Sequence, residues 1–201
     1  ETCLRSETTV KVFDQMRKLQ SYTDEGSPGR DWNVATGMVI EGKAGFQIMG
    51  DWAKGEFTAA GKVPGVDYYC SPTPSNNGYL YNVDSFIFYK TSDPDKQEGQ
   101  KLLAKLMMGK NFQKVFNLYK GSIPARLDVP MDEFDKCAKT SNSDIKTAGA
   151  SGGLVPSFAH GMAQGNTMKA ALQDIITEHF NSDMSSVDAA NALADSVLAN
   201  M

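Results

Sequence analysis

The stretch that decides the fold reads Ala44-Gly45-Phe46-Gln47-Ile48-Met49-Gly50-Asp51-Trp52-Ala53. Residues 44–49 predict a β-strand that ends at Gly50. Asp51 then stands where a carboxylate caps a helix, and we expect a short helix that stops near Gly61. Helix and strand therefore alternate in this part of the chain, which is typical of an α/β fold.

Helical patterns lie before and after this stretch. One helix is expected to follow Ser6, and another covers residues 33–41 with Gly42 as its end. Residues 83–89 are β-branched and aromatic, so they predict a second strand. Further helices are expected from Asp93-Pro94 to Gly109 and from there to Gly121, then over 167–181 and after 185–188. Residues 124–153 indicate short helices and loops.

Composition narrows the class of protein. The chain has 201 residues, a formal net charge of -4 and 41% hydrophobic residues, which suits one domain or two small lobes. A weakly acidic chain lacks the basic footprint that nucleic-acid binding needs, so we expect no nucleic-acid partner. No run of 18 apolar residues occurs in the sequence, so none of it predicts a membrane span.

The cysteines and histidines do not predict a metal site. Cys3, Cys70 and Cys137 contain no C-x-x-C pair, and His160 and His179 are distant from the cysteines in sequence. Catalytic and nucleotide-binding motifs are also missing, and we expect no cofactor. From the residues alone, Cys70 and Cys137 are equally well read as a disulfide or as buried free thiols.

Two tryptophans have the chemistry of a sugar site. Trp32 follows Asp31 and Trp52 follows Asp51. Aromatic rings stack on the apolar face of a pyranose, while carboxylates accept hydrogen bonds from its hydroxyl groups. The alternative is structural: both tryptophans belong to the core, and both aspartates cap helices.

Three further polar residues stand out in apolar surroundings. Asp84 opens the predicted strand 83–89, where an unpaired carboxylate is costly. Lys120 ends a helix, where a cation is favourable in any case. His160 lies in an apolar loop, and a buried, hydrogen-bonded histidine is its default interpretation. A nucleophilic pair of Ser157 with His160 is a further alternative.

The order of these segments resembles a known family. The motifs are Gly50-Asp51-Trp52-Ala53, Asn82-Val83-Asp84-Ser85-Phe86, Lys120-Gly121-Ser122-Ile123-Pro124 and Ala159-His160-Gly161. Together they resemble the solute-binding proteins of carbohydrate ABC importers, with the glucose/mannose-binding branch as the nearest match. The likeness runs from about Val10 to the end of the chain.

The resemblance implies a site and a covalent link. Its fold is periplasmic binding protein-like, with two α/β lobes that hold sugar in the cleft between them. Two aromatic walls and three polar ligands would come from this chain, with Asn82 as a weaker candidate. The implied substrate-binding residues are Trp32, Trp52, Asp84, Lys120 and His160, and the implied disulfide joins Cys70 to Cys137.

The resemblance also implies an arrangement of lobes. Family members are about twice as long, so we expect the amino-terminal lobe to be missing from this chain. Residues 1–81 and 125–201 are then expected to form the carboxy-terminal lobe. Residues 82–124 are expected to cross the hinge and pack with the missing lobe, which leaves apolar helix surface exposed.

The expected function follows from the family. The protein would bind a monosaccharide, with glucose as the expected ligand, and deliver it in the periplasm to the membrane permease of an ABC importer. It would not be an enzyme. Two alternatives remain: an isolated fragment or interaction module that binds no sugar, and a glycoside hydrolase with Asp51 and Asp84 as its carboxylate pair.

Overall fold

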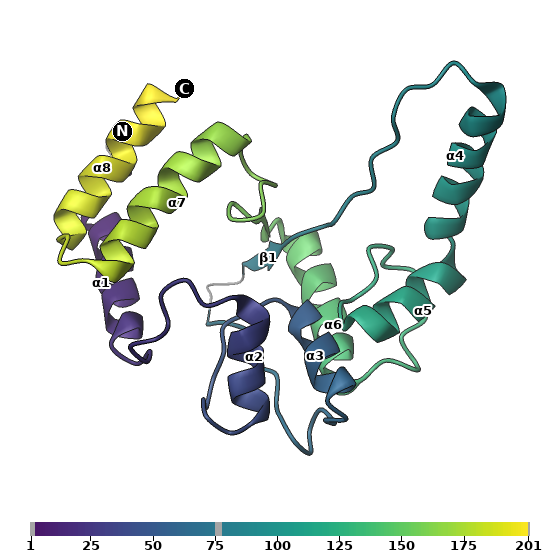
Figure 1. The fold of residues 1–201 in the computed structure, drawn as a ribbon, viewed down its shortest axis with the longest axis horizontal. Helices are drawn as coiled ribbons and strands as arrows, with labels where there is room; N and C mark the ends of the chain where they lie inside the picture. Colours follow the sequence, from purple (N-terminus) through teal and green to yellow (C-terminus); the bar gives the residue numbers. More distant parts are fainter. Residues whose placement is uncertain (1–2, 75–77, 201) are drawn as a thin grey trace. The chain divides into compact units, whose positions relative to one another are not determined.

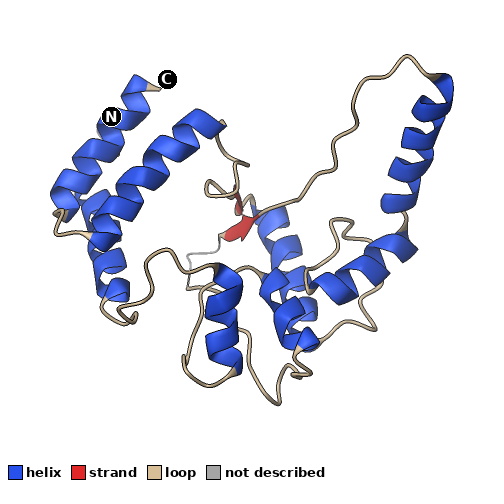
Figure 2. Cartoon of the chain, viewed as in Figure 1, coloured by secondary structure: helices blue, strands red, loops and turns tan. Residues whose placement is uncertain are grey.

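The chain forms two compact units. A computed structural model describes residues 3–74 and 78–200. Glu1–Arg30 and Pro156–Met201 make up one unit, called the terminal unit here, and Asp31–Val155 make up the central unit. Helices dominate the described residues of both units (Figure 2).

The described residues of the terminal unit include three helices that pack together (Figure 1). These are α1 (Glu7–Gln20), α7 (Asn166–Asn181) and α8 (Ser186–Ala199). Phe13 of α1 is buried against Ala189 and Ala190, whose small side chains let the two helices approach closely. The capping residue expected for α8 is confirmed, because the Ser185 hydroxyl accepts a hydrogen bond from the Asp188 backbone N–H at 3.1 Å.

A histidine is buried within the terminal unit. His179 has no exposed surface, and its ring centroid lies 4.8 Å from that of Phe13 in an edge-to-face arrangement. Its Nε2 contacts the Ser186 hydroxyl at 3.4 Å, whereas its Nδ1 finds no hydrogen-bond partner among the residues that the structure describes. Burial lowers the pKa of His179; Arg17 acts in the same direction and Asp14 opposes it.

The central unit carries five α-helices among its described residues. They are α2 (Trp32–Ile40), α3 (Lys54–Ala59), α4 (Pro94–Met107), α5 (Lys110–Lys120) and α6 (Lys136–Ser151), and the 3-10 turn η1 (Asp51–Ala53) leads into α3. Asp31, Asp93 and Asp135 each accept hydrogen bonds from backbone N–H groups at the starts of α2, α4 and α6. The helix boundaries expected at Gly42, Asp93 and Gly121 are confirmed.

Two predicted strands are wrong. The described strands are β1 (Tyr79–Tyr81) and β2 (Leu154–Pro156), which pair with each other. Residues 44–49 form no ladder; instead Gln47 donates to the Trp32 carbonyl at 2.9 Å and accepts from the Thr36 hydroxyl at 2.8 Å. Residues 83–89 are irregular and exposed, because no described strand lies beside them to complete a ladder.

The region 124–153, expected to hold only short helices and loops, contains the 16-residue helix α6. The sequence of α6 is polar and has no strong apolar stripe, which is why it did not predict a long helix. Contacts with other parts of the central unit hold α6 in place. Ala138 packs with Val129 and Phe134, and buried Lys54 of α3 forms an ion pair with Asp135 at 2.7 Å.

A disulfide joins Cys70, in the loop after α3, to Cys137 of α6, with 5.7 Å between the Cα atoms. The family resemblance implied this pairing, and the structure contains it. Cys3 is a free, exposed thiol.

The buried His179 predicts that acid destabilises the terminal unit. Since its native pKa is lowered, the unfolded chain binds a proton more readily below the ordinary value of about 6.5. The free energy of unfolding is therefore expected to be intact above about pH 6.5 and to fall as the pH drops below it. Thermal unfolding between pH 5 and 8 measures this pH dependence. A His179 pKa at or above 6.5, measured by NMR titration, contradicts it.

Candidate functional site

The candidate site begins with a backbone contact between α3 and α5. Gly121 ends α5 at a φ of 88°, and a Cβ atom built on it would lie 2.5 Å from the Gly55 backbone nitrogen. A Cβ on Gly55 would lie 2.8 Å from the Lys120 carbonyl oxygen. Only glycine permits this approach, so the last residue of α5 is held directly against α3.

A carboxylate holds the chain that follows this contact. Asp51 accepts a hydrogen bond from the Ile123 backbone N–H at 2.8 Å, and Ser122 donates to it through its side chain. Burial raises the pKa of Asp51, while the nearby lysines 54 and 120 act against that rise. The expectation that Asp51 caps the following helix is wrong, because Asp51 is itself the first residue of η1, and the cap positions of η1 and α3 are held by Gly50 and Ala53.

Lys120 and Asp84 come together as an ion pair. Asn82 donates to the other carboxylate oxygen of Asp84 at 3.3 Å, so the carboxylate is held from both sides. Asp84 is largely exposed, with 66% of its side chain accessible. An ionised carboxylate accepts hydrogen bonds only, through both of its oxygens. The group is therefore held in a fixed orientation on an accessible surface.

Both tryptophans of the prediction lie in the central unit and are half-buried. Trp32 is the first residue of α2, and its carbonyl accepts the hydrogen bond from Gln47. The ring of Trp52 covers Gly50 so closely that a Cβ atom there would lie 2.1 Å from it. Neither tryptophan is fully buried, so each keeps part of its surface accessible.

His160 belongs to the terminal unit, and the expectation that it is buried is wrong. It is exposed, and its Nδ1 shares a hydrogen bond with the Ser157 hydroxyl at 2.7 Å. Ser157 is only 3% exposed. A nucleophilic hydroxyl must reach a substrate carbonyl, so this buried hydroxyl serves to orient the His160 ring instead.

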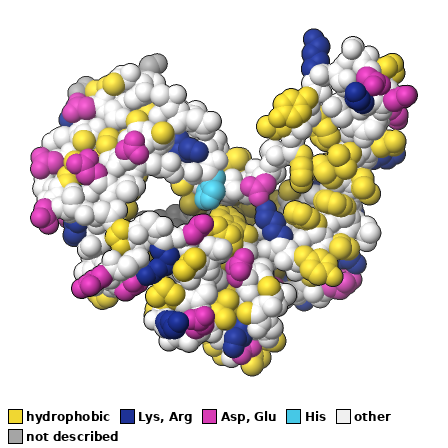
Figure 3. All heavy atoms as spheres, viewed as in Figure 1, with side chains coloured by type: hydrophobic (Ala, Val, Ile, Leu, Met, Phe, Trp, Pro, Cys, Tyr) yellow, Lys and Arg dark blue, Asp and Glu magenta, His cyan; other side chains and the backbone are white. Residues whose placement is uncertain are grey.

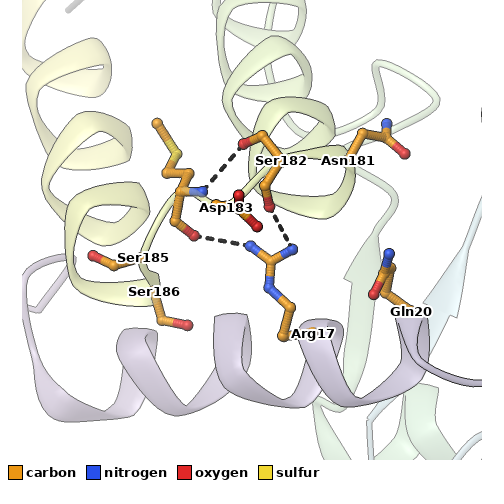
Figure 4. A pocket seen from close by; sticks show the side chains of 8 residues that line it. Arg17, Gln20, Asn181, Ser182, Asp183, Ser185 and Ser186 are labelled. Carbon is orange, nitrogen blue, oxygen red and sulfur yellow. Dashed lines mark hydrogen bonds between the residues drawn. The ribbon is translucent and has the colours of Figure 1, made fainter.

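The terminal unit has a polar hollow of about 530 Å³ near the connection between α7 and α8 (Figure 4). Arg17 of α1 points into this region, and its guanidinium donates to the carbonyl oxygens of Ser182 at 2.7 Å and Met184 at 2.8 Å. These carbonyls lie just after the end of α7. The arginine therefore ties α1 to the α7–α8 connection, which is a structural task.

The central unit has an apolar hollow of about 550 Å³ on α5. Phe112 and Phe116 stack there with centroids 5.5 Å apart, and the Lys120 ammonium lies 5.9 Å from the Phe116 ring centroid. Apolar side chains gather over α4 and α5 in the space-filling view (Figure 3). Tyr119 is 80% exposed and Leu106 is 60% exposed, so this surface is accessible in the present chain.

Two searches of the described residues complete the inventory. Across residues 3–74 and 78–200, none of the helices is long and apolar enough to span a bilayer. In the same part of the chain, histidine, cysteine and carboxylate side chains form no cluster that could hold a metal ion.

Sequence reasoning found the ion-paired residues but missed what holds them. The bond between Asp51 and Ile123 and the contact between Gly55 and Gly121 join segments far apart in sequence. The sequence offered two signals for these contacts. One was a glycine at the end of a predicted helix, and the other was an aspartate for which both helix capping and sugar binding had been considered.

Comparisons with known proteins identify the family of this chain. Residues 2–143 match the model of the bacterial extracellular solute-binding proteins. The chain belongs to this family.

Curated relatives support the assignment. A probable sugar-binding periplasmic protein of Brucella suis is 47% identical over 195 residues, which are 96% of this chain and 46% of the relative. One of the same description from Rhizobium meliloti is 45% identical over 93% of this chain and 45% of its own length. An uncharacterized ABC transporter extracellular-binding protein of Pyrococcus horikoshii is 34% identical, over 85% of this chain and 38% of its own length.

These comparisons bear on length and location. The chain spans about half the length, or less, of the relatives it matches. The family and its relatives place the protein outside the cytoplasm, in the periplasm, as the sequence analysis expected.

The contact between α3 and α5 yields a matched pair of substitutions. Gly121 and Gly152 both end helices at positive φ, but only Gly121 has neighbours within 4 Å of a built Cβ. Gly152→Ala is expected to cost about 1–2 kcal/mol from backbone strain alone. Gly121→Ala is expected to cost about 1–3 kcal/mol more, because the methyl group overpacks the contact. Urea unfolding measures both, and equal losses would contradict the close approach.

Proposed function

We propose that this chain is part of a periplasmic binding protein that holds a monosaccharide, with glucose as the first candidate, and delivers it to the permease of an ABC importer. The ion pair of Asp84 with Lys120 carries this proposal. It presents an acceptor and a donor side by side on an accessible surface, which suits the hydroxyl groups of a sugar.

The aromatic residues complete the proposed chemistry. A pyranose has an apolar C–H face, which stacks on an aromatic ring, and a rim of hydroxyl groups, which needs charged or polar partners. Trp32 and Trp52 are half-buried, so each can keep a fixed orientation and still offer a face to a ligand. His160, exposed and oriented by Ser157, would supply a further polar contact.

The relatives support sugar as the ligand class. Those of Brucella suis and Rhizobium meliloti are described as probable sugar-binding periplasmic proteins, and that of Pyrococcus horikoshii as an ABC transporter extracellular-binding protein. Glucose itself rests on the resemblance of the sequence motifs to the glucose/mannose-binding branch. Binding without covalent change is the activity proposed, with no enzymatic step.

Calorimetric titration of the protein, extended to the length of its relatives, tests this proposal. Glucose is expected to bind, with mannose, galactose and xylose as competitors. Lys120→Met is expected to weaken binding roughly tenfold to a hundredfold, as expected for a lost charge-assisted hydrogen bond. Lys114→Met is the matched control: it lies on the same helix and also pairs with an acid, Glu133. Absence of binding to all four sugars would refute the proposal.

The hydrolase alternative predicts a different result in the same experiment. Two catalytic carboxylates must flank one bond. Here Asp84 is paired with Lys120, and Asp51 is occupied with the Ile123 backbone N–H. Release of reducing sugar from an oligosaccharide, lost in Asp51→Asn and Asp84→Asn, would favour the hydrolase. An unchanged oligosaccharide favours the binding protein.

We also propose that the apolar surface of α4, α5 and residues 82–92 packs against the remaining half of the protein. Phe86, Ile87 and Leu106 are more than half exposed, and residues 83–89 have a strand-like sequence with no described partner strand. In this arrangement residues 82–124 cross the hinge, while residues 1–81 and 125–201 form the carboxy-terminal lobe. A solvent-exposed surface on which several apolar side chains lie together is typical of an interface.

Hydrogen exchange tests the packing proposal. Backbone amides of α4 and α5 are expected to exchange faster in the 201-residue chain than in the protein extended to the length of its relatives, because packing suppresses local opening. Amides of α1 and α8 serve as the internal control. Equal exchange of α4 and α5 in both proteins would contradict the proposal and favour a free interaction module.

A further inference from the structure

We propose that Asp51 is a positioning residue: its carboxylate clamps the turn after α5 and so holds Lys120 in register with Asp84. This inference rests on the proposed function, since the purpose of that register is to receive a sugar. Asp51 itself is not proposed to contact the ligand.

The first step of the argument is the geometry of the clamp. Asp51 and Ile123 are 72 positions apart in sequence, and one hydrogen bond of 2.8 Å joins them. Ile123 stands three residues after Lys120, and its side chain packs against the cluster that contains Val129 and Phe134. The turn is thus held on one side by core packing and on the other by the carboxylate.

The second step is that the turn after α5 is fixed at both of its ends. Gly121 touches the Gly55 backbone, and α3, which carries Gly55, directly follows the turn η1 that carries Asp51. The contact and the clamp therefore attach the two ends of the same short segment, residues 121–123, to the same piece of chain. Because this segment is held at both ends, the position of Lys120 at the end of α5 is fixed as well.

The third step is the chemistry of the acceptor. A half-buried carboxylate loses solvation, and burial raises the pKa of Asp51 accordingly. Lys54 and Lys120 act against this rise, but each forms its ion pair with another carboxylate, Asp135 and Asp84 respectively. The essential property is then an oxygen that accepts from the Ile123 N–H. An asparagine offers such an oxygen in the same place, whereas alanine offers none.

The test compares Asp51→Ala with Asp51→Asn, and with Asp93→Ala as a control that removes a helix cap elsewhere in the same unit. The Ile123 amide is expected to exchange at least tenfold faster in Asp51→Ala. It is expected to remain protected in Asp51→Asn and in Asp93→Ala. A protected Ile123 amide in Asp51→Ala overturns the clamp.

Sugar affinity provides the second readout, in the protein extended to the length of its relatives. Asp51→Ala is expected to bind the sugar at least tenfold more weakly, and Asp51→Asn is expected to stay within threefold of the parent. Equal affinity of the parent and Asp51→Ala overturns the positioning role while leaving the proposed function standing. Failure of the parent itself to bind overturns the proposed function, and the positioning role with it. A loss in Asp51→Asn equal to that in Asp51→Ala also overturns the role, because the charge would then be what matters.

Discussion

The backbone contact between α3 and α5 is possible because glycine occupies both of its sides. Gly55 and Gly121 remove the two side chains that would keep these helices apart, and the positive φ of Gly121 turns the chain out of α5 at the same point. Because α5 ends there, Lys120 is near enough to Asp51 to act against the rise in its pKa, and the Ile123 N–H reaches the Asp51 carboxylate. The site thus depends on the absence of two methyl groups more than on any single attraction.

Charge is distributed around this contact according to burial. The buried Lys54 has a fixed partner in Asp135, which also caps α6, so its charge is neutralised where solvent is excluded. The pair of Asp84 and Lys120 is more exposed, so solvent and other molecules can reach it. Groups that are held in position before a ligand arrives lose little freedom on binding, which is the advantage of such an arrangement.

The failed strand predictions and the exposed apolar surface have one cause. Residues 83–89 have the composition of a strand, yet a strand exists only beside a neighbour that accepts and donates its backbone hydrogen bonds. The described residues provide no such neighbour for this segment, so it stays irregular and its side chains stay in solvent. Residues 44–49 also lack a partner strand among the described residues, and Gln47 instead connects them to α2 through a hydrogen bond from its side chain. Composition indicates how readily a segment forms a strand, and the presence of a neighbouring strand decides whether it does.

Local interactions are what the sequence determined by itself. The caps at Asp31, Asp93 and Ser185 and the helix ends at Gly42 and Gly121 act within a few residues, so their patterns can be read directly from the chain. The family motifs likewise pointed to the residues that form the ion pair of the site. The tertiary structure alone decided the task of Asp51, the exposure of His160 and the pairing of β1 with β2. Each of these depends on which distant segment comes to lie alongside, and no short-range pattern encodes that choice.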